Sequence, residues 1–222
     1  SSLWNKATYV MYQQHPSHEL KKLFARQPYQ GAIPSSAKFL FVGLDANYSA
    51  GIENTPIFQN VLEYHQDGVS FWRRHGVHHP FLLSQYRGDG RRYHATFAKI
   101  GFKPEHAELV SFVELLHVPT IGRNKLSPED LNPSHLQMLN SAILEGDAEH
   151  IFISAGVARL MRASGAFSWL PKAPTTLGSL PLLYKANQRA VYQYLHFSNY
   201  GKFQLQLERE ASAIALLIPK LN

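Results

Sequence analysis

Asp45 and His196 are the two side chains of this sequence best placed to do chemistry. Each follows a short apolar run, at 38–43 and 191–195. Such runs, bounded by turn residues, are typical of buried strands, and the sites of parallel sheets lie just beyond the carboxyl ends of the strands. If both strands are parallel, a carboxylate and an imidazole share one edge, as in a hydrolytic site. The structural alternatives are that Asp45 caps a turn or a helix and that His196 is a structural histidine.

The composition limits the classes of site that the chain can form. Its 222 residues fit one domain, and a formal net charge of +6 permits a polyanionic partner. The absence of cysteine excludes disulfides, zinc–thiolate sites, iron–sulfur clusters and a cysteine nucleophile. His78 and His79 are adjacent, but no third ligand follows at the usual spacing, so neither a metal nor a cofactor is predicted.

The sequence carries no marks of a membrane or secreted protein. No apolar stretch approaches the roughly 20 residues needed to cross a bilayer, and no signal peptide is recognisable. We therefore expect a cytoplasmic protein with no membrane partner.

Strands and helices alternate along the chain, which predicts a parallel sheet covered by helices. The fold expected is α/β, a three-layer α/β/α sandwich with a central, mainly parallel four-stranded sheet. A single domain spans residues 1–222, and residues 1–36 form an N-terminal helical preface. The expected strands are 38–43, 108–113, 150–154 and 191–195, with an extra strand at 180–185. The expected helices are 55–64, 91–100, 127–145 with an interruption near Pro133, one opening at Gly156, and 202–217.

Two short motifs give the chain a resemblance to a known family. Gly43-Leu44-Asp45-Ala46-Asn47-Tyr48 is similar to the water-activating motif of the uracil-DNA glycosylase superfamily, Gly-Gln-Asp-Pro-Tyr-His or Gly-Ile-Asn-Pro-Gly. His196-Phe197-Ser198-Asn199-Tyr200 is similar to its second motif, His-Pro-Ser-Pro-Leu-Ser. Tyr64 with Phe71-Trp72 resembles the mismatch-specific, thymine-DNA glycosylase-like branch. The resemblance covers roughly residues 37–205.

The resemblance implies a DNA glycosylase that hydrolyses the N-glycosidic bond of a flipped, damaged or deaminated base. Asp45 matches the residue that activates water, and His196 matches the residue that stabilises the leaving base. Tyr64 is the implied stacking residue, with Tyr48 and Phe71 as alternatives. The other implied contacts are Asn47 and Phe112 to the base, and Ser198, Asn199, Lys202 and Arg123 to phosphate. The implied partner is damaged or single-stranded DNA, and we expect the protein to be a monomer.

The chain departs from the family pattern at several positions. Ala46 and Phe197 stand where the two motifs have proline, and Asn47 replaces the residue that follows the first of these prolines. Phe112 stands where the family has its base-reading asparagine, so uracil specificity does not follow; Asn47 or Glu114 could read a base instead. Two other functions stay open: a non-catalytic nucleic-acid-binding relative of the same fold, and a nucleoside or glycoside hydrolase.

Overall fold

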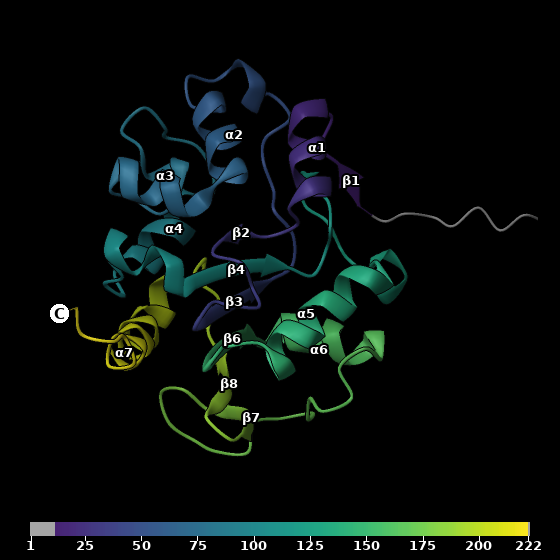
Figure 1. Cartoon of the computed structure of the whole chain (residues 1–222), viewed down its shortest axis with the longest axis vertical. Coiled ribbons are helices and arrows are strands. Elements are labelled where there is room, and N and C mark those ends of the chain that lie inside the picture. The colour runs from purple at the N-terminus through teal and green to yellow at the C-terminus, as the bar shows by residue number, and fades with distance from the viewer. Residues whose placement is uncertain (1–11, 222) are drawn as a thin grey trace, which may run out of the picture.

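The computed structural model describes residues 12–221, and its fold is α/β (Figure 1). Within these residues the main sheet is mixed and six-stranded, in the order β2-β4-β3-β6-β8-β7. Its four inner strands are parallel: β4 (Val110–Glu114), β3 (Phe39–Gly43), β6 (His150–Ser154) and β8 (Arg189–Tyr194). Its two edge strands are antiparallel: β2 (Gln30–Gly31) and β7 (Leu182–Ala186).

The prediction of a central, mainly parallel four-stranded sheet is therefore wrong in strand number and in the character of its edges. The four inner strands lie near their predicted positions, and the extra strand predicted at 180–185 is β7. The prediction missed β2, because two residues are too few to show a strand periodicity.

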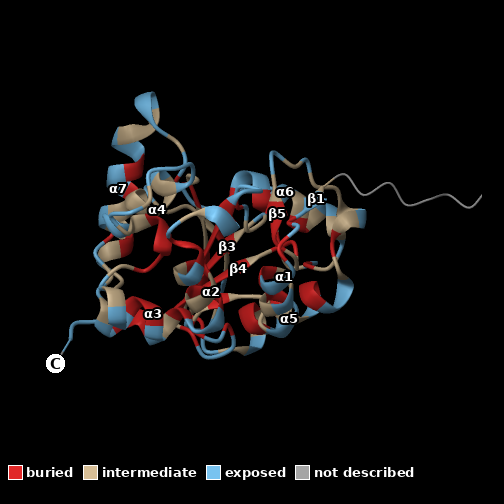
Figure 2. Cartoon of the chain, turned by 90° about the horizontal axis from the view of Figure 1, so that it is seen from above, coloured by how far each residue is buried: buried red, intermediate tan, exposed pale blue. Residues whose placement is uncertain are grey.

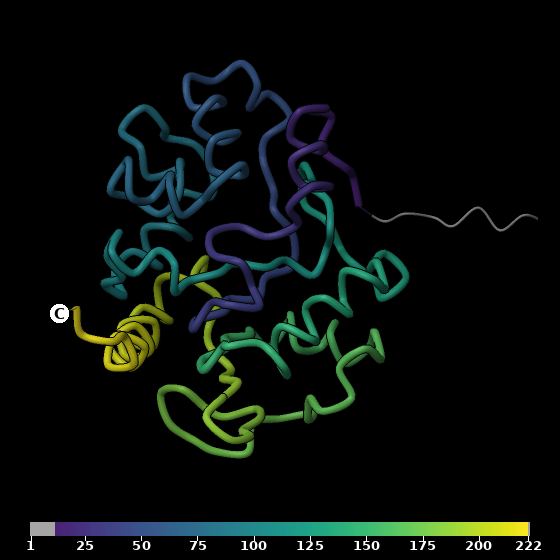
Figure 3. Tube along the Cα trace, in the orientation of Figure 1, coloured from purple at the N-terminus to yellow at the C-terminus, as the bar shows by residue number. Residues whose placement is uncertain are grey.

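The N-terminal segment combines one helix with strand pairings. Residues 1–11 of the predicted helical preface lie outside the described part of the chain. In the remainder, α1 (His18–Arg26) begins at its N-cap, Ser17, whose hydroxyl accepts from the backbone N–H of Leu20. On either side of α1 the chain is extended: β2 joins the main sheet, and β1 (Gln13–Gln14) pairs with β5 (Thr120–Ile121). Figure 3 shows this segment passing beside the chain that follows β4.

The predicted helices are present in the predicted order with shifted ends, and a further helix, α3 (Gly68–His75), was not predicted. The α-helices are α2 (Phe58–Gln66), α3 (Gly68–His75), α4 (Arg91–Ala98), α5 (Pro133–Glu145), α6 (Ala155–Ser164) and α7 (Gln204–Ala215). The 3₁₀ turns are η1 (Ile52–Asn54), η2 (Pro80–Leu82), η3 (Pro104–Leu109), η4 (Pro128–Asp130) and η5 (Gly201–Phe203). The predicted helix 127–145 divides into η4 and α5, because Asn132 caps a new start at Pro133 by accepting from the His135 N–H.

Alternate side chains of β3 enter two different hydrophobic cores. Leu40 and Val42 share one core with α5 and α6. Phe39 and Phe41 share the other with α3, α4 and α7. Buried residues follow the strands and the inner sides of the helices, whose outer sides are exposed (Figure 2). No helix within residues 12–221 is both long and apolar enough to cross a membrane.

Candidate functional site

A pocket of about 300 Å³ lies at the carboxyl ends of β3, β4 and β8. Asp45 and His196 both line it, as expected for residues that follow parallel strands. Further residues from the loop after β3 and from β2, β4, α2, η2 and α4 complete its wall. They include Gln30, Asn47, Tyr48, Tyr64, His65, His79, Phe81, Tyr93, His94, Phe112 and Glu114.

Two neutral donors hold the carboxylate of Asp45. The hydroxyl of Thr120 donates to Asp45 Oδ2 at 2.5 Å, and the amide of Asn124 donates to the same oxygen at 3.1 Å. Thr120 is fully buried in β5 and also accepts from Asn47 Nδ2 at 3.1 Å, so its own proton points to Asp45. Among the described residues no hydrogen bond reaches Asp45 Oδ1, which leaves this oxygen free to accept a proton from water.

The amide of Asn47 is engaged within the protein. Besides Thr120, its Nδ2 donates to the carbonyl oxygen of Gly122 at 2.6 Å. These bonds hold the loop after β3 against β5. In the motif that this loop resembles, a proline stands at the position of Ala46 and restricts the loop instead. The predicted base contact of Asn47 stays a prediction.

Glu114 places a second carboxyl group in the pocket. Gly43 pairs with Glu114 at the ends of β3 and β4, and a Cβ at position 43 would lie 2.9 Å from Glu114 Cδ. The glycine therefore makes room for the carboxyl group. Burial, followed by the charge of Asp45, raises the pKa of Glu114 to about 8. At neutral pH the pocket thus holds a protonated Glu114 beside Asp45, and unlike environments of this kind separate the acid and base roles of two carboxyl groups.

His196 is a neutral imidazole whose tautomer is set by its neighbour. Burial lowers its pKa. The backbone N–H of Ser198 donates to His196 Nδ1 at 3.2 Å, and the Ser198 hydroxyl lies 2.6 Å from the same nitrogen. Because Nδ1 accepts, the single proton of the ring resides on Nε2. The ring lies against Tyr93, with 5.0 Å between centroids.

Aromatic and histidine rings form the walls of the pocket. Tyr48, Tyr64 and Phe112 are buried residues of this wall. Their contact with a base stays a prediction. His79 and His94 stack with centroids 3.5 Å apart, and burial lowers the pKa of both, so they are neutral rings.

Phe71 lies outside the pocket wall. It is fully buried behind Tyr64, with the two ring centroids 5.7 Å apart. Its position supports Tyr64 from behind and does not favour direct stacking on a base.

The predicted phosphate-binding residues lie mainly at the surface. Arg123, Ser198 and Lys202 are exposed, and the ammonium group of Lys202 sits over the ring of Phe203 at 5.1 Å. Asn199 donates through Nδ2 to the carbonyl oxygen of His196 at 2.9 Å. Contacts of these residues with phosphate stay predictions.

Several residues of the site could not be assigned to it from sequence patterns. Gln30, His79, Tyr93 and His94 come from elements whose packing sets which side faces the pocket. Thr120, which holds Asp45 from behind the wall, belongs to a two-residue strand. From the sequence, Glu114 is only a possible base-reading residue. Its place as the last residue of β4 is the signal that identifies it.

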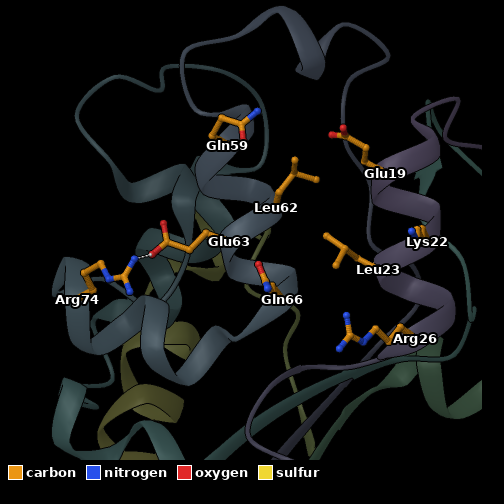
Figure 4. A pocket seen from close by; sticks show the side chains of 9 residues that line it. All are labelled: Glu19, Lys22, Leu23, Arg26, Gln59, Leu62, Glu63, Gln66 and Arg74. Atoms are coloured by element: carbon orange, nitrogen blue, oxygen red, sulfur yellow. Dashed lines mark hydrogen bonds and ion pairs between the residues drawn. The ribbon is translucent and has the colours of Figure 1, made fainter.

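A wider groove of about 580 Å³ separates α1 from α2 (Figure 4). Long side chains of mixed charge line it, including Glu19, Lys22 and Arg26. Glu63 is already paired there with Arg74 at 2.9 Å. No group of three or more metal-ligating side chains occurs here or elsewhere in residues 12–221. The pocket at the sheet edge is therefore the better candidate.

A scan against protein-family models found no match for the chain, and a search of curated proteins found no relative. The pocket itself is therefore the basis for a function.

Proposed function

We propose that this protein is an N-glycosidic hydrolase of the uracil-DNA glycosylase type, acting on a base flipped out of DNA. The observation that carries the proposal is the position of Asp45 and His196 on the wall of one aromatic pocket of about 300 Å³. This volume is at the low end for ligand pockets, which suits a single planar base. The hydrophobic cores on both faces of the sheet support the three-layer α/β/α arrangement of such enzymes.

Cleavage of an N-glycosidic bond develops positive charge on the sugar and negative charge on the base. Asp45 stabilises the sugar cation and accepts through Oδ1 a proton from the attacking water. The water oxygen bonds to the anomeric carbon, and the electron pair of the broken bond passes to the base. His196 Nε2–H and the protonated Glu114 are donors suited to this developing charge, and such donors act strongly in a pocket that excludes water.

The surroundings of the pocket support a nucleic-acid substrate. Rings of Tyr64 and Phe112 can stack on a flipped base, which contributes roughly 1–3 kcal/mol per base. The formal net charge of +6 and the exposed Arg123 and Lys202 favour contact with phosphate. We propose a monomeric, cytoplasmic enzyme that uses only its own side chains.

The test compares the wild type with Asp45→Asn on labelled oligonucleotides. Single- and double-stranded substrates would contain uracil, hypoxanthine, xanthine or a mismatch, and alkaline strand cleavage would report the abasic product. We expect release of at least one base, lowered by Asp45→Asn at least about 100-fold, as for loss of a general base. Asp147→Asn, at an exposed aspartate, is the matched control and should keep the wild-type rate.

Other outcomes would assign the pocket differently. Salt-dependent DNA binding without release of any base at high enzyme concentration would indicate a non-catalytic binder. Cleavage of free nucleosides without DNA binding would indicate a small-molecule hydrolase.

A further inference from the structure

Gln30 is a buried glutamine that the mechanism above does not use. It lies in the edge strand β2 and pairs with Phe112 of β4. Directly opposed residues of an antiparallel pair project from the same face of a sheet, so the Gln30 amide stands beside the Phe112 ring. Glu114, two residues further along β4, projects from this face as well. All three line the pocket.

The amide nitrogen of Gln30 has no hydrogen-bond partner in the described part of the chain. The residue is only 4% exposed, and its Nε2 is buried without a hydrogen bond to any described residue. Leaving a buried donor unsatisfied is unfavourable, and such a group in a native structure calls for a ligand or a water. A carbonyl oxygen of a molecule bound in the pocket would satisfy it.

The main chain next to Gln30 is held firmly in place. Gly31 has a φ of +78°, which favours glycine, and a Cβ at Gly68 would lie 2.6 Å from the Gly31 nitrogen. The start of α3 thus packs directly on β2. The backbone that carries the Gln30 amide is therefore fixed before any ligand binds, as a recognition group requires.

We propose that Gln30 reads the edge of the substrate base, and that the substrates are bases with a lactam edge, a carbonyl next to a ring N–H, as in uracil and hypoxanthine. This rests on the proposed glycosylase function. Nε2 donates to the base carbonyl, and Oε1 accepts from the ring N–H beside it. The amide missing from β4, where Phe112 stands, is thus supplied by the neighbouring strand β2. Amino-bearing bases place a donor where the lactam carries its carbonyl, so in this orientation of the amide they meet Nε2 donor to donor. The comparison of the two classes of base below therefore tests the orientation as well.

The test uses Gln30→Leu and Gln30→Glu in the full chain. Single-turnover release would be measured on single-stranded oligonucleotides containing uracil, hypoxanthine, cytosine or adenine. We expect the wild type to release only the lactam bases, and both variants to do so about 10- to 100-fold more slowly, as for loss of one or two hydrogen bonds. Gln59→Leu, at an exposed glutamine in the groove of Figure 4, is the control and should keep the wild-type rate.

A measurement of stability distinguishes a role of Gln30 in base recognition from a structural role. Gln30→Leu removes a buried unsatisfied amide, so its melting temperature should equal or exceed that of the wild type while its activity falls. Binding of lactam-containing and undamaged oligonucleotides to the Asp45→Asn variant, with and without Gln30→Leu, gives a second readout independent of turnover. Gln30→Leu should abolish the preference for the lactam-containing strand.

The outcomes distinguish the two proposals. If the wild type releases a base and the Gln30 variants keep its rate and its base preference, the role of Gln30 is refuted and the glycosylase proposal stands. If no base is released and the Asp45→Asn variant does not prefer lactam-containing DNA, both proposals fall.

Discussion

Replacing Glu114 by glutamine should change how the stability of this protein depends on pH. The wild-type carboxyl group has an ordinary pKa of 4.5, and in the folded state burial and the nearby Asp45 raise that pKa to about 8. The folded protein therefore binds this proton more tightly than the unfolded chain. By linkage, the free energy of unfolding falls as the pH rises from about 4.5 to about 8, and it levels off above this range. The Glu114→Gln variant cannot ionise and should lack this fall.

The expected size of the difference follows from the shift. A pKa change from 4.5 to about 8 corresponds to an upper limit of about 5 kcal/mol, and structural relaxation will reduce it to a few kcal/mol. At pH 9 the variant should be the more stable protein, and at pH 4.5 the two should be nearly equal. If Glu114 donates a hydrogen bond to the leaving base, wild-type activity should also fall above pH 8.

Urea unfolding followed by circular dichroism at pH 5, 7 and 9 measures this difference. Burial also raises the pKa of Glu210 to about 7, but Glu210 is present in both proteins and cancels from the comparison. Glu145→Gln, at an exposed glutamate, is the control and should keep the wild-type slope. Equal pH slopes for the wild type and Glu114→Gln would refute the assignment of a partly buried Glu114 that is protonated at neutral pH.

Two further substitutions test the residues that position the carboxyl groups of Asp45 and Glu114. Gly43→Ala places a Cβ 2.9 Å from Glu114 Cδ. Because the end of the Glu114 side chain can move, we expect the free energy of unfolding in urea to change by no more than about 1 kcal/mol. Base release should be at least about 10-fold slower, because the carboxyl group is displaced. A rate equal to that of the wild type would show that the position of this carboxyl group is unimportant. Thr120→Val removes the 2.5 Å hydrogen bond to Asp45 and a partner of Asn47, which should cost about 1–3 kcal/mol of stability and slow base release. Unchanged unfolding and turnover would mean that Thr120 does not hold Asp45.

The inner part of the sheet could be predicted because its strands are apolar on both faces. Runs such as Phe39–Val42 and Ile151–Ile153 are recognisable because a strand that is buried on both faces has apolar residues at every position. Their parallel order in turn predicted that Asp45 and His196 would border one pocket. The first expectation depends on local composition, and the second on the alternation of strands and helices along the chain.

Other parts of the fold depend on contacts between distant residues and leave no local trace. The strands β1, β2 and β5 have two residues each, and Gln30 reads as an ordinary polar residue until its pairing with Phe112 is known. The expected second strand, 108–113, began and ended too early, because residues 104–109 form a 3₁₀ turn. That small shift hid Glu114 as the true end of the strand.

The two strand pairings of the N-terminal segment also bear on the order in which the protein folds. β1 pairs Gln14 with Thr120, the residue that holds Asp45, and β2 brings Gln30 next to Phe112. Both contacts close loops of roughly 80 to 110 residues, and such contacts form slowly because of the chain entropy lost on closure. The pairing of β3 with β6 spans a similar separation, from Phe39 to His150. We therefore expect the local helices to form first, and the centre of the sheet and the pocket to form later and together. A folding intermediate that holds only its helices would then lack the pocket and be inactive.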